Sequence, residues 1–161
     1  MIQRGKSGRR GEPGIVFSYR LENAWCGVLN TVKVIDGKTP VVRYSFSEES
    51  LPGYMPPLED SELGIGKDEL ERIRELLEDD RLYEKEWLED PFDVAVLDGY
   101  AQAFELENRG KHICAQGYNI DFCRGDMEHC LHSALMIQVL ENVQNILVPL
   151  GVPAECFRLG L

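Results

Sequence analysis

The side chains best suited to chemistry gather in one short segment of the sequence. All three histidines and three of the five cysteines lie there: His112, Cys114, Cys123, His129, Cys130 and His132. Imidazole nitrogens and thiolates are the usual ligands of zinc, which binds about four of them in a tetrahedral array. A thiol beside an imidazole base can also act as a nucleophile. The segment therefore raises both a metal hypothesis and a thiol hypothesis.

The spacing of these residues does not assemble one complete metal site. His112 and Cys114 are two residues apart on an expected strand, so they share a face, but Ile113 is the natural core residue there. Those two side chains then point away from the helices, while His129 and His132 point toward them. No Cys-x-x-Cys pair is present. We therefore predict no cofactor and keep zinc as the alternative, with all six residues as candidate ligands.

The favoured interpretation of these residues is structural. Cysteines are small apolar side chains that pack well in a core. An expected helix over 127–149 aligns His129 and His132 with its apolar stripe, so both should be hydrogen-bonded at a core margin in apolar surroundings. Burial disfavours the imidazolium, which predicts a depressed histidine pKa and a loss of stability as the pH falls through about 6.5. Replacing either histidine by leucine should then be tolerated.

A thiol enzyme is the next alternative. Cys130 lies near the start of the expected helix, a position that lowers a thiol pKa. His112 could approach Cys114 or Cys123, but the sequence shows no oriented base or oxyanion hole. Dinucleotide, phosphate-loop, H-E-x-x-H, G-x-S-x-G and EF-hand patterns are all absent. We predict no catalytic residues, and the sequence favours a non-enzymatic role.

The elements that must position these residues follow from hydrophobic periodicity. Alternation predicts strands over 15–21, 25–35 and 40–47, with Asp36-Gly37 supplying positive φ angles in a tight turn. Helical spacing predicts a helix over 67–79. A second hairpin is expected over 95–118, turning at residues 108–110. Asp126 is the expected N-cap of the helix over 127–149, and Gly151 should end it.

These elements predict a single two-layer α+β domain over residues 1–161. The expected order is β-β-β-α-β-β-α, in an antiparallel sheet of about five strands with the two main helices on one face. Residues 1–13 are expected to form a flexible basic arm, and residues 48–66 a Pro/Gly-rich connection. The apolar tail over 152–161 should pack on the body or on a partner.

The turn residues of the second hairpin carry a resemblance to a group of proteins. Leu97-Asp98-Gly99, Asn108-Arg109-Gly110-Lys111 and Gln116-Gly117-Tyr118-Asn119 precede the last helix. Over about residues 70–150 the chain resembles small uncharacterised bacterial α+β proteins of unknown function. Cys123 and the histidines of the last helix depart from that pattern. The resemblance implies the fold and no chemistry.

Charge sets limits on the partners. The net charge is −11, and residues 48–93 hold 17 acidic and 5 basic side chains. Such a surface repels phosphate, so no nucleic-acid partner is expected. No apolar run predicts a membrane span or a signal peptide, and the cysteines follow no disulfide pattern. We therefore predict an acidic cytoplasmic domain of bacterial type, which binds a protein partner or a second copy of itself.

Overall fold

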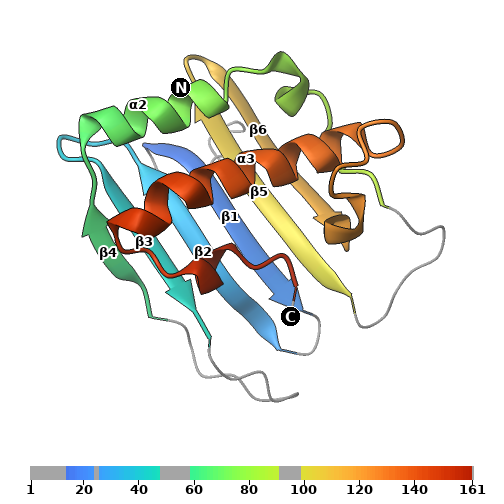
Figure 1. Cartoon of the computed structure of the whole chain (residues 1–161), viewed down its shortest axis with the longest axis horizontal. Helices are drawn as coiled ribbons and strands as arrows, with labels where there is room; N and C mark the ends of the chain where they lie inside the picture. Colours follow the sequence, from blue (N-terminus) through green and yellow to red (C-terminus); the bar gives the residue numbers. More distant parts are fainter. Residues whose placement is uncertain (1–13, 24–25, 48–58, 91–98, 161) are drawn as a thin grey trace, which may run out of the picture.

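The computed structural model describes residues 14–23, 26–47, 59–90 and 99–160. Six antiparallel strands form one sheet in the order β4-β3-β2-β1-β5-β6 (Figure 1). The strands are β1 (Ile15–Asn23), β2 (Gly27–Ile35), β3 (Val41–Phe46), β4 (Ser61–Gly64), β5 (Tyr100–Asn108) and β6 (Lys111–Tyr118). The two main helices are α2 (Lys67–Leu76) and α3 (Leu131–Leu147). The predicted α+β class, with an antiparallel sheet, is confirmed.

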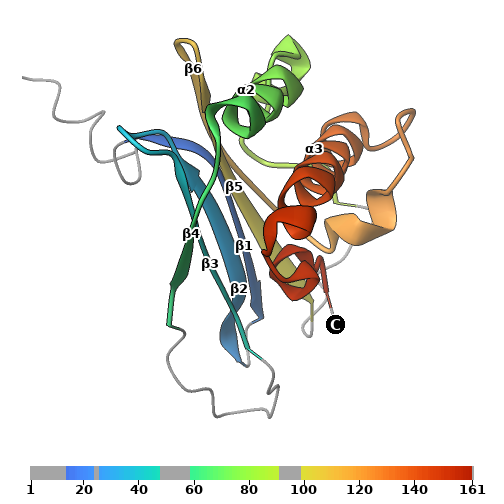
Figure 2. The same ribbon diagram turned by 60° about the vertical axis from the view of Figure 1, so that its left-hand side comes forward.

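Both main helices lie on the same face of the sheet (Figure 2). No other described element forms a layer on the opposite face, which we call the open face. Alternation along β1 explains the two faces, because successive strand residues point to opposite sides. Phe17, Tyr19 and Leu21 are fully buried beneath the helices, whereas Arg20, which lies between them, is exposed. The predicted period of two therefore holds from Phe17 to Leu21, whereas Val16, beside a register shift at the start of the strand, is buried as well.

The sixth strand is a correction to the predicted count of about five. Strand β4 lies inside the predicted Pro/Gly-rich connection over 48–66 and pairs with β3, so that Leu63 lies opposite Val42. Its four residues, Ser-Glu-Leu-Gly, contain one large apolar side chain. So short a segment shows no alternation, and its pairing with β3 is not visible in the sequence. The predicted arm over 1–13 and the first part of that connection, residues 48–58, lie outside the described residues.

The C-terminal segment packs back on the helix side of the sheet. Val152, Cys156, Phe157 and Leu159 are buried, and the 3-10 helices Val148–Leu150 and Ala154–Phe157 shape the segment. Three buried sheet residues bind its backbone carbonyls. Tyr19 Oη donates to Arg158 O at 2.6 Å, Asn30 Nδ2 to Cys156 O at 2.8 Å, and Gln102 Nε2 to Leu159 O at 2.8 Å. The apolar tail is therefore part of the core.

Three local predictions have different outcomes. The turn between β5 and β6 has Arg109 at φ 50° and Gly110 at φ 90°, as a two-residue hairpin requires. Neither Asp36 nor Gly37 has a positive φ angle, because residues 36–40 form a longer connection. Gly151 follows the last helical turn at φ 123°, as predicted.

The last helix begins later than predicted. Helix α3 starts at Leu131, with Cys130 as its N-cap residue in place of Asp126. Asp126 instead accepts a hydrogen bond from the backbone N–H of His129 at 3.0 Å, and so closes a turn before the helix. His129 and His132 therefore do not share a helical face. Among the described residues, no helix is long and apolar enough to cross a membrane.

Candidate metal centre

Three potential metal ligands meet on the open face, where β5 and β6 lie side by side. Glu105 on β5 lies directly opposite Cys114 on β6, and Glu107 lies opposite His112. Residues two apart on a strand share a face, so Glu105, His112 and Cys114 all point away from the helices. The intervening Ile113 is buried in the core, as predicted. The tight turn at Arg109-Gly110 fixes this register.

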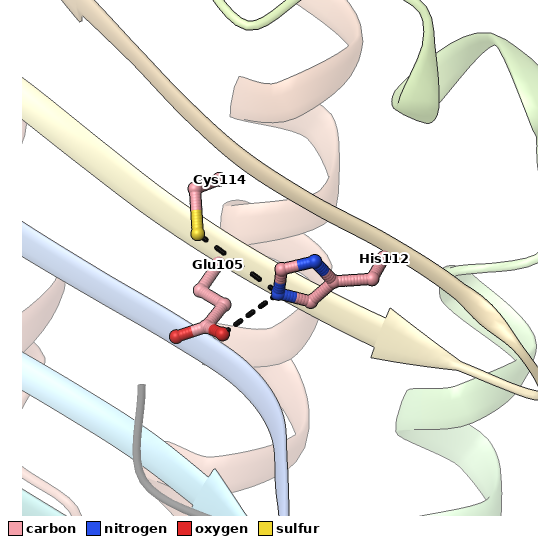
Figure 3. A group of neighbouring side chains, drawn as sticks. All are labelled: Glu105, His112 and Cys114. Carbon is pink, nitrogen blue, oxygen red and sulfur yellow. Dashed lines mark hydrogen bonds and ion pairs between the residues drawn. The ribbon is translucent and has the colours of Figure 1, made fainter. Parts of the chain in front are cut away.

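The three side chains converge on a small region (Figure 3). His112 Nε2 lies 2.8 Å from Glu105 Oε2 and 3.9 Å from Cys114 Sγ. One ligand atom from each residue lies within 4.8 Å of the other two. The His112 and Glu105 side chains are only 20% and 15% exposed, so neighbouring atoms hold both in place.

The direction of the histidine ring distinguishes a metal centre from a catalytic triad. In a triad the imidazole bridges two groups, one through each ring nitrogen, and so transfers a proton between them. Here Glu105 and Cys114 both approach the same nitrogen, Nε2 (Figure 3). Three donor atoms arranged around one point suit an ion better than a proton relay. The arrangement of base and acid that the thiol hypothesis requires is therefore not formed at Cys114.

The donor atoms also have suitable separations. Zinc bonds of about 2.0 to 2.3 Å in a tetrahedron place neighbouring ligand atoms roughly 3.3 to 3.8 Å apart. The contacts of 2.8 and 3.9 Å lie close to that range on either side. Carboxylate, imidazole and thiolate are all zinc ligands, and three protein ligands leave a fourth position open. Small side-chain rotations would bring the three donors onto one ion.

A surface hollow lies beside these ligands on the open face. Its volume is about 300 Å³, and its walls include Ser18, Arg20, Glu105, Cys114 and Gln116. Ala103 forms part of its floor, because the strand register places it between Arg20 and Gln116. A methyl group at that position leaves room between longer neighbours. Two of the three potential ligands, Glu105 and Cys114, therefore border this space.

The other predicted ligands lie elsewhere. Cys123 and Cys130 are buried on the helix side of the sheet, as the structural interpretation of the cysteines predicted, whereas Cys114 is exposed on the open face, which contradicts that interpretation. Burial, together with the neighbouring Cys130 thiol, raises the pKa of Cys123 to about 12. A thiol with so high a pKa stays protonated and unreactive at neutral pH. His129 is 73% exposed and contacts Asp126, which contradicts its predicted place at the core margin.

His132 also differs from its prediction, because its surroundings are acidic and not apolar. Its Nδ1 lies 2.6 Å from Glu89 Oε2, and its Nε2 lies 2.7 Å from Glu84 Oε1. Both contacts are satisfied when both ring nitrogens carry protons. Burial lowers the pKa of His132, but the hydrogen bonds and charges of the two carboxylates outweigh burial and raise it. The predicted depressed pKa is therefore wrong.

We call Glu84, Glu89 and His132 the acidic clasp. It attaches residues 84–89 to the first turn of α3, where Glu89 also accepts a hydrogen bond from the Ser133 N–H at 2.8 Å. Burial raises the pKa of Glu89, but the bonds from His132 and Ser133 prevail and lower it to about 2. Both ring nitrogens of His132 form ion pairs with these carboxylates. Its geometry therefore explains stability, whereas Glu105, His112 and Cys114 form the candidate site.

Comparisons with known proteins assign neither a family nor an activity to this arrangement. The resemblance to small bacterial α+β proteins stays a prediction. No protein-family model matches the chain, and no curated protein is similar to it.

Proposed function

We propose that this protein binds a divalent transition-metal ion of the zinc class through Glu105, His112 and Cys114. The convergence of one oxygen, one nitrogen and one sulfur within 4.8 Å of one another carries the proposal. Their mixed hard and soft character favours zinc over calcium or magnesium, which prefer oxygen ligands alone. The adjacent hollow lets solvent or a small ligand reach the ion.

Metal analysis of the purified protein tests this proposal. We expect about one equivalent of zinc to bind, and Co²⁺ to bind in its place with a visible spectrum typical of tetrahedral coordination. The sulfur ligand should add a thiolate-to-cobalt charge-transfer band. Cys114→Ser should remove that band, and His112→Gln and Glu105→Gln should each weaken Co²⁺ binding at least tenfold.

Matched variants control for general damage to the fold. His129→Gln removes an exposed histidine of the same segment, and Glu107→Gln removes the next glutamate on the same strand face; both should keep wild-type Co²⁺ affinity. Far-UV circular dichroism should show that every variant is folded. The proposal fails if His112→Gln and His129→Gln weaken binding equally, or if Co²⁺ binds without a sulfur-dependent band.

A second candidate function is assembly through the open face, with a second copy of this chain as the occupant. Trp87 is 64% exposed and Tyr118 is 55% exposed. Trp87 forms a parallel β-bridge with Gln116 of β6, and bridged residues share a face of the sheet. Tyr118 lies two residues after Gln116 on the same strand and therefore shares that face, so both aromatic residues border the open face. Such exposed aromatic side chains are enriched at protein interfaces.

Charge on the open face favours a self-complementary dimer. Lys33 lies on β2, and Arg20, which is ion-paired with Glu22, lies on β1, whereas Glu105 and Glu107 lie on β5. A twofold dimer brings each patch onto its opposite in the partner copy, because residue i meets j and j meets i. Lys33 of each copy would then face the acidic side chains of β5 in the other copy.

Sedimentation over a range of protein concentrations tests the assembly proposal. We expect a monomer–dimer equilibrium that weakens as salt is added, because salt screens surface charge pairs. Trp87→Ser should raise the dimer dissociation constant at least tenfold, and Phe122→Ser, which removes another exposed aromatic residue, serves as the control. A monomer at every concentration, or an equal effect of both variants, would contradict assembly through this face.

A further inference from the structure

We propose that Cys123 and Cys130 form a redox-sensitive dithiol, which a peroxide oxidises to an intramolecular disulfide. Neither residue belongs to the candidate metal centre or to the acidic clasp. Cys123 ends the 3-10 helix Ile120–Cys123, and Cys130 is the N-cap residue of α3. The proximity of the two thiols, their unequal exposure and the helix start beside Cys130 support the proposal.

The two cysteines lie at the ends of a tightly folded segment. The Asp126 N–H donates to Cys123 O at 2.9 Å, and the Cys130 N–H donates to Asp126 O at 2.9 Å, so two successive turns keep the segment compact. The two thiols hydrogen-bond to each other, and Cys123 Sγ also contacts Glu89 O at 3.7 Å. Thiols in contact meet the first requirement of a disulfide, which cannot bridge side chains that point apart.

The two thiols differ in their access to solvent. Cys130 is 5% exposed, whereas Cys123 is completely buried. A small oxidant such as hydrogen peroxide therefore reaches only Cys130. Burial, and after it the Cys130 thiol, raises the pKa of Cys123 to about 12, so Cys123 stays protonated at neutral pH. Cys130 is accordingly the thiol that attacks the oxidant, and Cys123 is the thiol that reacts with the product.

The start of α3 supports the first step. Cys130 caps a helix of 17 residues, and the backbone N–H groups at a helix N-terminus stabilise a thiolate. The thiolate sulfur attacks one oxygen of hydrogen peroxide and the O–O bond breaks. The departing hydroxide takes up the proton that the thiol released and leaves as water. Cys130 is then a sulfenic acid.

Cys123 completes the disulfide in the second step. Its sulfur attacks the sulfenic sulfur of Cys130, the S–O bond breaks, and the Cys123 proton leaves with the hydroxide as water. The dithiol is oxidised and the peroxide is reduced, so no further reactant is needed. Glu89 O loses the thiol donor but keeps the Ser133 hydroxyl at 2.8 Å. The new link restricts the unfolded chain, so oxidation should raise the melting temperature.

Peptide mapping of the peroxide-treated protein tests the proposal. Arg124 lies between the two cysteines, so trypsin releases them in separate peptides, residues 112–124 and 125–158, which a disulfide joins. The remaining thiols are alkylated as the protein is unfolded. Fragmentation of the joined peptides should place the bond between Cys123 and Cys130, and dithiothreitol should separate the peptides again.

Variants identify the two steps. Cys123→Ser and Cys130→Ser should each abolish the joined peptides, whereas Cys114→Ser, which removes an exposed thiol from the open face, should keep them. Dimedone, which labels sulfenic acids, should label Cys130 in Cys123→Ser, because no second thiol reacts with it there. It should not label the buried Cys123 in Cys130→Ser.

Two results would overturn the proposal. In the first, peroxide oxidises the exposed Cys114 while Cys123 and Cys130 both stay reduced. In the second, the joined peptides persist in Cys130→Ser, which would mean that other cysteines form the bond. If a serine variant does not fold, the position of the bond in the wild-type protein decides.

Discussion

Glu89→Ala should lower the free energy of unfolding at pH 6 by about 2 to 4 kcal/mol, because it removes the central acceptor of the acidic clasp. The Glu89 carboxylate is only 18% exposed and contacts His132 Nδ1 at 2.6 Å and the Ser133 N–H at 2.8 Å. Alanine leaves both donors without this acceptor at the first turn of α3. Urea unfolding, followed by far-UV circular dichroism, measures the loss.

Two variants distinguish the loss of the buried Glu89 carboxylate from the loss of a negative charge near His132. Glu84 contacts the same histidine but is 54% exposed, so Glu84→Ala should cost less than about 1 kcal/mol. Glu89→Gln keeps an acceptor for the Ser133 N–H and should fall between the two. If Glu84→Ala destabilises the protein as much as Glu89→Ala, the importance of the buried carboxylate is contradicted.

Local pattern was sufficient to predict most of the fold. Alternating apolar residues identified β1, β2, β3, β5 and β6, because each strand buries one face beneath the helices. Helical spacing identified both main helices, with errors of a few residues at their ends. Strand β4 was missed, since its pairing with β3 stabilises it and its own four residues carry no periodic signal. Whether such a short strand forms is determined by contacts between residues that are distant in the sequence.

Local pattern likewise predicted only part of the candidate site. His112 and Cys114 were predicted as candidates, and Ile113 correctly indicated that they point away from the helices. Glu105 was missed, although the sequence held the signal: a two-residue turn at Arg109-Gly110 fixes the register and places residue 105 opposite residue 114. The ring orientation of His112, which favours a metal over a proton relay, follows only from the three-dimensional structure.

The error at His132 had a different cause. Its predicted position on an apolar stripe assumed a helix beginning near residue 127, and it considered only the side chains of that helix. The carboxylates that contact it belong to residues 84 and 89, more than forty positions earlier. The acidic residues of the segment 48–93 served only to argue against a nucleic-acid partner, yet two of them form the surroundings of this histidine. Sequence periodicity identifies a buried face without identifying what covers it.

His132→Leu should therefore lower the free energy of unfolding at pH 6 by about 2 kcal/mol, and the loss should diminish as the pH rises. The folded-state pKa of His132 is raised above its ordinary value of 6.5, so its contribution is fully present below 6.5 and is lost as the pH rises through the folded-state pKa. Above that pKa the neutral ring has one proton for two carboxylates, so one contact loses its donor.

The pKa of Glu89 sets the lower end of the pH range over which the acidic clasp stabilises the protein. Its pKa is lowered from 4.5 to about 2, so its stabilising contribution is present above 4.5 and is lost as the pH falls toward 2. The difference in stability between wild type and His132→Leu should accordingly be largest between about pH 4.5 and 6.5. Urea unfolding of both proteins at intervals from pH 5 to pH 9 measures it.

His129→Leu is the matched control, because its side chain is 73% exposed and contacts one carboxylate at the surface. It should change stability by less than about 0.5 kcal/mol at each pH. A loss in His132→Leu that grows as the pH rises would mean that the folded state favours the neutral imidazole. Such a result would contradict the acidic clasp and restore the apolar surroundings that the sequence predicted.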